Sequence, residues 1–282
     1  MVQGDILNSV TTASPSPYRD GWRVWLRKAD DNRYLQVSLF PLAVLLCWQG
    51  AFMLGWVSPI VLPSPAEVLA TLWRLASSGE LVGHLHTSVM RVVVGFSLGA
   101  LIGIVLGLSM GISRLTEQMV YPTFRAFCQV PTMAWLPLLM MLFGLGEALK
   151  IVIITKAVMV PLCINTFEGV RGIPAKYFEV ARVLQVRRRT LLLRLALPAI
   201  LPPTFSGARQ GLSSAWVSLV GVELLASMEG IGYMMNWGRT IFQLDIVLAG
   251  VVVVGLVGLA MDLMMARVEA RLGKWRVEKD EE

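Results

Sequence analysis

The segment Glu179–Pro198, EVARVLQVRRRTLLLRLALP, decides the fold that this sequence predicts. It is a long charged segment in the interior of a chain that otherwise consists mainly of apolar runs. Arginine side chains are costly to place in hydrocarbon, so a segment with this many of them is expected to lie in water. The arginines are Arg182, Arg187, Arg188, Arg189 and Arg194.

The same region carries a helical stripe of apolar side chains. Tyr177, Val180, Ala181 and Leu184 follow the spacing i, i+3, i+4 and i+7, which places them on one face of a helix. Pro174 suits the first turn of this helix, where its missing N–H would have no partner in any case. A short amphipathic helix has to bury its stripe. The pattern alone is equally compatible with packing on the protein's own helices and with docking into a partner protein.

The composition of the chain is that of an integral membrane protein. Of its 282 residues, 55% are hydrophobic and 16% are charged, and the mean hydropathy is +0.64. The net charge of +6 could favour nucleic acid, but the basic residues lie at the ends of apolar runs, where they set membrane topology. No nucleic acid partner is therefore expected. Three scattered cysteines and two histidines predict neither a disulfide framework nor a metal site.

Six apolar runs predict transmembrane helices. The first, residues 35–57, contains no Asp, Glu, Lys or Arg and is long enough to cross a bilayer. We therefore expect an all-α integral membrane protein with about six transmembrane helices in residues 35–266, between polar tails at 1–34 and 267–282. Residues 66–75 have the spacing of an amphipathic helix at the membrane surface. The remaining spans are residues 92–113, 126–146, 151–167, 201–227 and 246–261.

Three features of these spans predict how the helices pack. In the second span, a glycine at every fourth position forms a groove that another helix of the bundle can approach closely. Pro131 and Pro137 are expected to bend the third span. Lys156 lies near the start of the fourth span, so we expect its side chain to reach the membrane surface; the alternative is a cation beside the path of an anion. The glycines are Gly95, Gly99, Gly103, Gly107 and Gly111.

The distribution of basic residues predicts the orientation of the chain. An even number of spans places both termini on the same side of the membrane. That side has 19 Lys and Arg residues, including those of residues 171–200, whereas the opposite side has Arg74, Lys150 and Arg239. Because cytoplasmic loops are enriched in Lys and Arg, both termini and the arginine-rich loop between spans four and five are predicted to be cytoplasmic.

The sequence carries no convincing catalytic motif. It contains no G-x-x-x-x-G-K-[ST], so this chain is not expected to hold ATP itself, and it contains no H-E-x-x-H. No catalytic residue, bound cofactor or metal is therefore predicted, and the protein is not expected to be an enzyme. Ionisable residues inside the spans are few, which argues against a proton-coupled carrier. The energy source is expected to lie in another subunit, and the arginine-rich loop is the natural place to receive it.

Residues 179–198 resemble the EAA loop of ABC-type importer permeases. The family pattern is E-A-A, three residues, G, nine residues and I-x-L-P; here Glu179, Ala181 and Pro198 match it, whereas Val180 and Gln185 depart from it. Other motifs in the chain are similar to the sulfonate, taurine and nitrate branch. They are LPSP at 62–65, VP at 130–131, AWLPL at 134–138, FGLGE at 143–147, GIGY at 230–233 and DIVLAG at 245–250. Within that branch, SGEL at 78–81 and INT at 164–166 are most similar to aliphatic-sulfonate permeases.

The resemblance implies a function and a set of partners. The chain would be the permease subunit of an ATP-driven importer in the bacterial inner membrane, with an aliphatic sulfonate or taurine as the expected cargo. Its partners would be a second permease copy in a homodimer, two cytoplasmic ATPase subunits that bind ATP and Mg²⁺, and an extracytoplasmic substrate-binding protein. Nitrate, cyanate, bicarbonate or a vitamin precursor are alternative cargoes. A membrane scaffold that holds lipid headgroups through its basic loop is the alternative of another class.

The resemblance also assigns residues that would couple the permease to the ATPase. Glu179 would be the polar anchor of the coupling helix, Ala181 would allow close docking, and Arg182 would pair with acidic residues of the ATPase. Glutamine adopts positive φ less readily than the family's glycine, so we expect Gln185 to build the following turn differently, with the helix extended to Arg187. The set of coupling residues is Glu179, Ala181, Arg182, Gln185 and Pro198.

Candidate contacts for the substrate lie on the fourth and fifth spans. They are polar or aromatic residues whose alternative role is ordinary packing between helices. Glu223 precedes the glycine motif at 230–233, and we expect it to hydrogen-bond the backbone of that loop rather than to gate the pathway. The set of candidate contacts is Asn165, Ser213, Ser214, Trp216 and Glu223.

Overall fold

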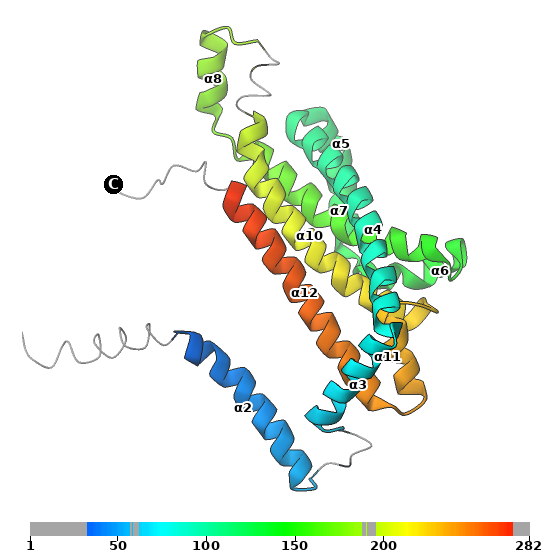
Figure 1. Ribbon diagram of the computed structural model, residues 1–282. Helices are drawn as coiled ribbons and strands as arrows, with labels where there is room; N and C mark the ends of the chain where they lie inside the picture. The colour runs from blue at the N-terminus through cyan, green and yellow to red at the C-terminus, as the bar shows by residue number, and fades with distance from the viewer. Residues whose placement is uncertain (1–32, 57, 59–61, 188–189, 191–195, 273–282) are drawn as a thin grey trace, which may run out of the picture. The chain divides into compact units, whose positions relative to one another are not determined.

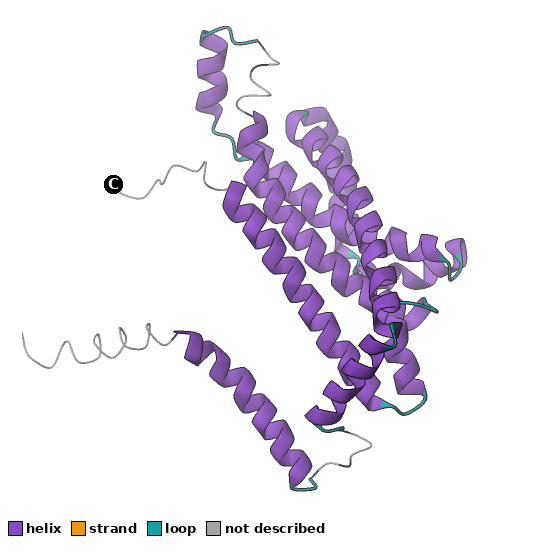
Figure 2. Ribbon diagram, in the orientation of Figure 1, coloured by secondary structure: helices purple, strands orange, loops and turns teal. Residues whose placement is uncertain are grey.

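The regular elements that the structure describes are all helices (Figure 2), which confirms the predicted all-α class. The computed structural model describes residues 33–56, 58, 62–187, 190 and 196–272, and no strand occurs among them. The N-terminal tail, the middle of the arginine-rich loop and the end of the C-terminal tail therefore lie outside the described residues.

The chain divides into two compact units, Met1–Pro59 and Ile60–Glu282. The described helix of the first unit is α2 (Arg33–Met53), which coincides closely with the first predicted span. Its apolar side chains from Leu39 to Leu46 are all exposed, as expected of a helix that meets lipid. The elements of the second unit are α3 (Pro65–Ser77), α4 (Glu80–Ile112), α5 (Arg114–Gln129), η1 (Thr132–Trp135), α6 (Leu136–Phe143), α7 (Glu147–Arg171), α8 (Ala175–Val183), α10 (Leu197–Ala226), α11 (Ile231–Thr240) and α12 (Leu244–Leu272).

Helix α7 forms the centre of the second unit and packs along both α4 and α10 (Figure 1). Leu149, Ile153, Val158 and Cys163 are completely buried along its length. A helix surrounded by other helices needs apolar side chains on every face, and the sequence of α7 accordingly has no broad polar stripe.

The close approach of α4 to α7 depends on the predicted glycine groove. A Cβ atom added at Gly99 would lie 2.6 Å from the carbonyl oxygen of Thr155, and one added at Gly107 would lie 2.6 Å from that of Cys163. A side chain at either position would therefore push the two helices apart. On α10, a Cβ atom at Gly207 would lie 2.7 Å from the Cβ of Asn165, so the second neighbour of α7 approaches it in the same way.

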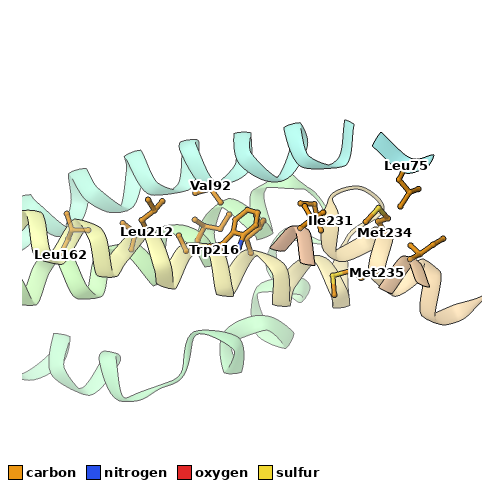
Figure 3. Packing of buried hydrophobic residues seen from close by; sticks show 14 residues of the cluster. Leu75, Val92, Leu162, Leu212, Trp216, Ile231, Met234 and Met235 are labelled. Carbon is orange, nitrogen blue, oxygen red and sulfur yellow. The ribbon is translucent and has the colours of Figure 1, made fainter. Parts of the chain in front are cut away.

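The main apolar core continues from α4, α7 and α10 into α11 and α12 (Figure 3). Trp216 lies within this core, and its indole N–H donates to the carbonyl oxygen of Val254 on α12 at 3.0 Å. Helix α3 confirms the short helix predicted at 66–75, and it packs against α12. Leu75 of α3 belongs to the same core, and Thr71 Oγ1 donates to Asp245 Oδ2 at 2.6 Å.

By length and composition, two described helices can cross a membrane: α4 and the Leu244–Glu269 part of α12. The number rises to four if two bent pairs each form one span. These pairs are α5 with η1 and α6, which bend by 90°, and α10 with α11, which bend by 41°. The count of six spans, the domain boundaries and the cytoplasmic termini stay predictions.

The predicted third span, residues 126–146, is not one helix. Helix α5 ends at Gln129, and after Val130 and Pro131 the chain continues as η1 and α6 at 90° to α5. Pro131 explains the break, because proline lacks an N–H donor and disfavours the helical conformation of the residue before it. Pro137 does not bend a helix as predicted, since it lies in the first turn of α6, where proline is tolerated.

Candidate functional site

One cluster of charged and polar side chains joins α4, α7 and α10. We define the Arg91 cluster as Ser88, Arg91, Glu147, Lys150 and Glu223. Arg91 is buried, and its Nε and Nη2 atoms donate to Glu147 Oε2 and Oε1 at 2.7 and 2.6 Å. Its Nη1 atom donates to Glu223 Oε1 at 2.7 Å. One guanidinium group therefore links carboxylates from two other helices.

Glu223 is the most deeply buried carboxylate of the Arg91 cluster, with 1% of its surface exposed. Besides Arg91, the hydroxyl of Ser88 donates to it at 2.9 Å, and the backbone N–H of Gly232 donates to Oε2 at 3.0 Å. The hydrogen bond from Gly232 confirms the predicted contact between Glu223 and the glycine loop. Because a buried carboxylate is stable only when its oxygens are satisfied, these partners tie the start of α11 to α4 and α10.

Glu147 is the exposed member of the Arg91 cluster, and its side chain is 57% exposed. It lies between the predicted third and fourth spans, at the start of α7, and also accepts a hydrogen bond from Lys150 Nζ at 2.7 Å. The hydrogen bond from Arg91 lowers the pKa of Glu147 to about 2, with a smaller contribution from Lys150 against the opposing effect of burial. Glu147 is therefore ionised at neutral pH, so the Arg91 cluster balances two cations with two carboxylates.

A second buried cation lies at the break between α5 and η1. We define the Lys156 site as Lys156, Phe127, Val130, Thr132 and Trp135. Lys156 is 8% exposed, and its Nζ atom donates to the carbonyl oxygen of Val130 at 2.9 Å. The same atom lies 5.0 Å from the ring centre of Phe127 and 5.8 Å from that of Trp135. The prediction that Lys156 reaches the membrane surface is wrong. The helix break leaves the Val130 carbonyl without a helical partner, and this carbonyl accepts a hydrogen bond from Lys156 inside the protein.

The two sites differ in how their cations are paired. Arg91 and Lys150 each contact a carboxylate, and so does Arg209, whose Nε and Nη2 atoms donate to Asp262 at 2.7 and 2.8 Å between α10 and α12. Among the described residues, no carboxylate lies within 4.0 Å of Lys156. Lys156 is thus a buried cation that the described part of the protein stabilises with a carbonyl group and two aromatic rings.

Helix α8 is formed by the predicted coupling segment, and it exposes its apolar stripe. Tyr177, Val180 and Leu184 are between 45% and 69% exposed, and Glu179 is exposed beside them. Ala181 is partly buried. The described part of the chain therefore does not cover this stripe, and of the two alternatives, docking into a partner is the one that the geometry favours.

The remaining coupling residues lie at the ends of the loop. The side chain of Arg182 is outside the described part of the chain, and Pro198 is exposed in the first turn of α10. Gln185 has a φ of +49°, and the N–H of Val186 donates to the carbonyl oxygen of Ala181 at 2.9 Å. This is the left-handed turn that usually carries glycine, so the expectation of a different turn and a helix extended to Arg187 is wrong.

The candidate substrate contacts do not form one group. Asn165 Nδ2 on α7 donates to Gln210 Oε1 on α10 at 3.3 Å, and Ser213 lies exposed one turn further along α10. Ser214 is partly buried. Trp216 points into the apolar core (Figure 3), as its hydrogen bond to α12 requires. Glu223 belongs to the Arg91 cluster, so the structure separates it from the polar contact between α7 and α10.

Sequence reasoning missed most of the Arg91 cluster. Glu223 was identified, but Lys150 was counted only as a topological signal and Arg91 was assigned no role. All of these residues lie at span ends that the predicted topology places on the same side of the membrane. Charges of opposite sign at neighbouring span ends were therefore the signal that could have identified the cluster.

Known proteins are similar to this chain in sequence and in fold. A Bacillus subtilis (strain 168) protein described as an aliphatic sulfonates transport permease protein is 40% identical over 252 residues, which cover 89% of this chain and 91% of the relative. The taurine transport system permease protein of Escherichia coli (strain K12) is 32% identical over 88% of this chain and 92% of the relative. A chain of the MetNI methionine ABC transporter, solved in inward-facing conformations, matches with a TM-score of 0.52 at 18% identity, over 67% of this chain and 95% of that chain.

The fold is thus one that occurs in an ABC transporter. Residues 99–274 match the family described as binding-protein-dependent transport system inner membrane component. The chain belongs to this family and is a transport permease, which confirms the resemblance found in its sequence.

Proposed function

We propose that this permease forms the translocation path of an ATP-driven importer for an aliphatic sulfonate or taurine. The observation that carries the proposal is the likeness, over nearly the whole chain, to permeases whose names state aliphatic sulfonates and taurine as cargo. A small organic anion also suits the chain, because its interior holds a buried cation at the Lys156 site that no described carboxylate neutralises.

The coupling to ATP hydrolysis runs through α8 in this proposal. Its exposed stripe of Tyr177, Val180 and Leu184 enters a groove of a cytoplasmic ATPase subunit, as amphipathic helices do in their partners' grooves. Glu179 is the polar anchor at the rim of that groove, and Ala181 allows close approach. When ATP and Mg²⁺ close the ATPase dimer, α8 moves as a rigid body and shifts α10, which begins beside Pro198.

The complex contains two copies of this chain, two ATPase subunits and an extracytoplasmic binding protein that delivers the substrate. The permease crosses the bacterial inner membrane with its termini and α8 on the cytoplasmic side. Alternation of the pore between outward and inward access follows the ATPase cycle. Nucleotide binding and hydrolysis take place on the partner subunits, and the role of this chain is to bind, orient and release the anion.

Charge reversal at Glu179 tests the coupling. In proteoliposomes that contain the whole complex, Glu179→Lys is expected to abolish taurine uptake and substrate-stimulated ATP hydrolysis while the permease remains in the membrane. Glu168→Lys is the matched control, since Glu168 is also an exposed glutamate, at the end of α7 and outside α8. Normal uptake by Glu179→Lys would contradict the coupling role.

The cargo is tested with the wild-type complex. Uptake of taurine or ethanesulfonate is expected to saturate with increasing substrate concentration. Nitrate, cyanate, bicarbonate and vitamin precursors, added as competitors, are expected not to reduce this uptake. Import of one of these competitors in place of the sulfonates would assign the same architecture to another cargo. Retention of the loop by anionic liposomes, without capture of the ATPase subunit, would instead support the membrane scaffold.

A further inference from the structure

The Lys156 site combines a buried cation with donors that the described protein does not saturate. A lysine ammonium group has three N–H donors. In this site one donor reaches the Val130 carbonyl at 2.9 Å, while the Thr132 hydroxyl, at 3.5 Å, is at the limit of a hydrogen bond. Buried charges in proteins are normally paired with an opposite charge, but no described carboxylate takes that role here.

Trp135 supplies a second and independent observation. Within the described residues, its Nε1 atom is the single buried side-chain nitrogen or oxygen that has no hydrogen-bond partner. Tryptophan N–H groups usually find an acceptor when they are buried, as Trp216 does with Val254. An unpaired donor and an unpaired cation therefore share one site, with Lys156 Nζ 5.8 Å from the ring centre of Trp135.

The position of the site suits a ligand that moves between helices. Residues 129–131 of the helix break are exposed, although Lys156 beneath them is buried. Element η1, which carries Thr132 and Trp135, packs against both α7 and α10. Non-helical backbone at membrane depth is tolerated where it is buried in protein or where it lines a polar path. Because this helix break lies beside a cation without a carboxylate partner among the described residues, it indicates a polar path.

We propose that the Lys156 site binds the sulfonate group of the transported substrate; this inference rests on the proposed function. A sulfonate carries one negative charge on three acceptor oxygens. Its oxygens accept hydrogen bonds from Lys156 Nζ, Trp135 Nε1 and the Thr132 hydroxyl, and its charge neutralises the Lys156 ammonium group. The rings of Phe127 and Trp135 supply apolar surface for the carbon atoms next to the sulfur.

Cys128 provides a matched control for this proposal. Cys128 is partly buried and directly follows Phe127 of the Lys156 site in the chain. An unperturbed thiol has a pKa of about 8.5 and is mainly neutral at pH 7, so it does not take the place of a carboxylate. Cys128→Ser alters the side chain that follows Phe127 without removing any donor of the proposed site.

The experiment measures binding of trifluoroethanesulfonate to the permease–ATPase complex in nanodiscs by fluorine NMR, without the binding protein. Loss of a hydrogen bond to a charged group predicts that Lys156→Gln weakens binding by about 10- to 100-fold and Trp135→Phe by about 10-fold. Lys156→Arg is expected to recover part of the affinity, because it keeps the charge. Cys128→Ser and Trp216→Phe are expected to bind as the wild type does.

The outcomes separate this inference from the function on which it rests. If the wild-type complex imports no sulfonate, the proposed function fails. If it imports taurine but Lys156→Gln and Trp135→Phe bind the probe with unchanged affinity, the function stands and the Lys156 site is overturned. If Lys156→Gln does not assemble, the affinities of Lys156→Arg and Trp135→Phe for the probe test the proposal instead. If Trp216→Phe weakens probe binding as much as Trp135→Phe does, the loss reflects helix packing in general, and the proposal is contradicted.

Discussion

The Arg91 cluster and the Lys156 site both bury cations in the same helix bundle, but they stabilise these cations with different partners. In the Arg91 cluster, the guanidinium contacts Glu147 and Glu223, and hydrogen bonds from Ser88 and Gly232 complete the shell of Glu223. At the Lys156 site, the ammonium group contacts a carbonyl group and two aromatic rings. The first site is balanced in charge and closed, whereas the second carries a charge that an anion can neutralise.

This difference indicates what each site can do. Removing a charge from water costs several kcal/mol, and a pair repays it only when the geometry is good and the remaining polar atoms are satisfied. The Arg91 cluster meets these conditions without a ligand, so it fixes the relative positions of α4, α7, α10 and α11. The Lys156 site meets them in full only with an anion, which makes its stability depend on what is bound.

The largest predicted effect is the loss of the cation from the Arg91 cluster. Arg91→Met leaves Glu223 buried without its cation, and breaking such a pair is expected to cost about 3–5 kcal/mol. Lys156→Met leaves no described carboxylate unpaired, so it is expected to cost less than half of that. Thermal unfolding of the two variants in nanodiscs without substrate measures the difference.

Two results bear on that comparison. The double variant Arg91→Met with Glu223→Leu is expected to recover part of the lost stability, because it removes the buried carboxylate together with its partner. A Lys156→Met variant as unstable as Arg91→Met would contradict the distinction, since it would show that the Lys156 site also holds the fold together.

The next effect compares two tryptophans. Trp216→Phe removes a hydrogen bond to Val254, whereas Trp135→Phe removes an N–H that has no partner in the described part of the chain. Both changes remove the same volume, so the difference isolates the hydrogen bond. We expect Trp216→Phe to lower the free energy of unfolding by about 1 kcal/mol more than Trp135→Phe, measured by thermal unfolding without substrate. Equal losses would mean that Trp135 has an acceptor.

The sequence predicted those parts of the fold that depend on local pattern. The glycine groove of α4 needs only a four-residue repeat, and the break at Pro131 needs only the chemistry of proline. The turn at Gln185 was mispredicted because glycine is usual in the left-handed conformation, although the surrounding hydrogen bonds can hold another residue there. Local preference is a tendency, and the bond from Val186 to Ala181 overrides it.

The site was harder to predict, because its partners are distant in the chain. Arg91 and Glu223 are 132 positions apart, and Arg91 and Glu147 are 56 positions apart, so no spacing rule connects them. Lys156 was placed at the membrane surface because the sequence did not show that the break before η1 would turn the Val130 carbonyl toward it. Such pairings follow from how the helices pack, which periodicity does not specify.

The smallest predicted effect concerns Glu147, the exposed end of the Arg91 cluster. Glu147→Gln keeps Arg91 paired with Glu223 and removes an ion pair at a side chain that is 57% exposed, where solvent screening limits its contribution. We expect this variant to lose about 1 kcal/mol or less at pH 7. A loss as large as that of Arg91→Met would show that the exposed carboxylate, rather than Glu223, holds the cluster.

The stabilising effect of Glu147 is expected to depend on pH, and the pKa of its carboxyl group gives the direction of that dependence. The pKa of Glu147 is about 2 in the folded protein and about 4.3 in an unfolded chain, so its stabilising effect is fully present above the higher value. As the pH falls through this window, the unfolded chain takes up the proton first, and the advantage of wild type over Glu147→Gln should shrink, with part of it left at pH 3 because the folded pKa lies lower. Unfolding curves of both proteins between pH 7 and pH 3 test this, with Lys156→Gln as a comparison. That variant leaves Glu147 intact, so its difference from wild type should not shrink with the titration of this carboxylate.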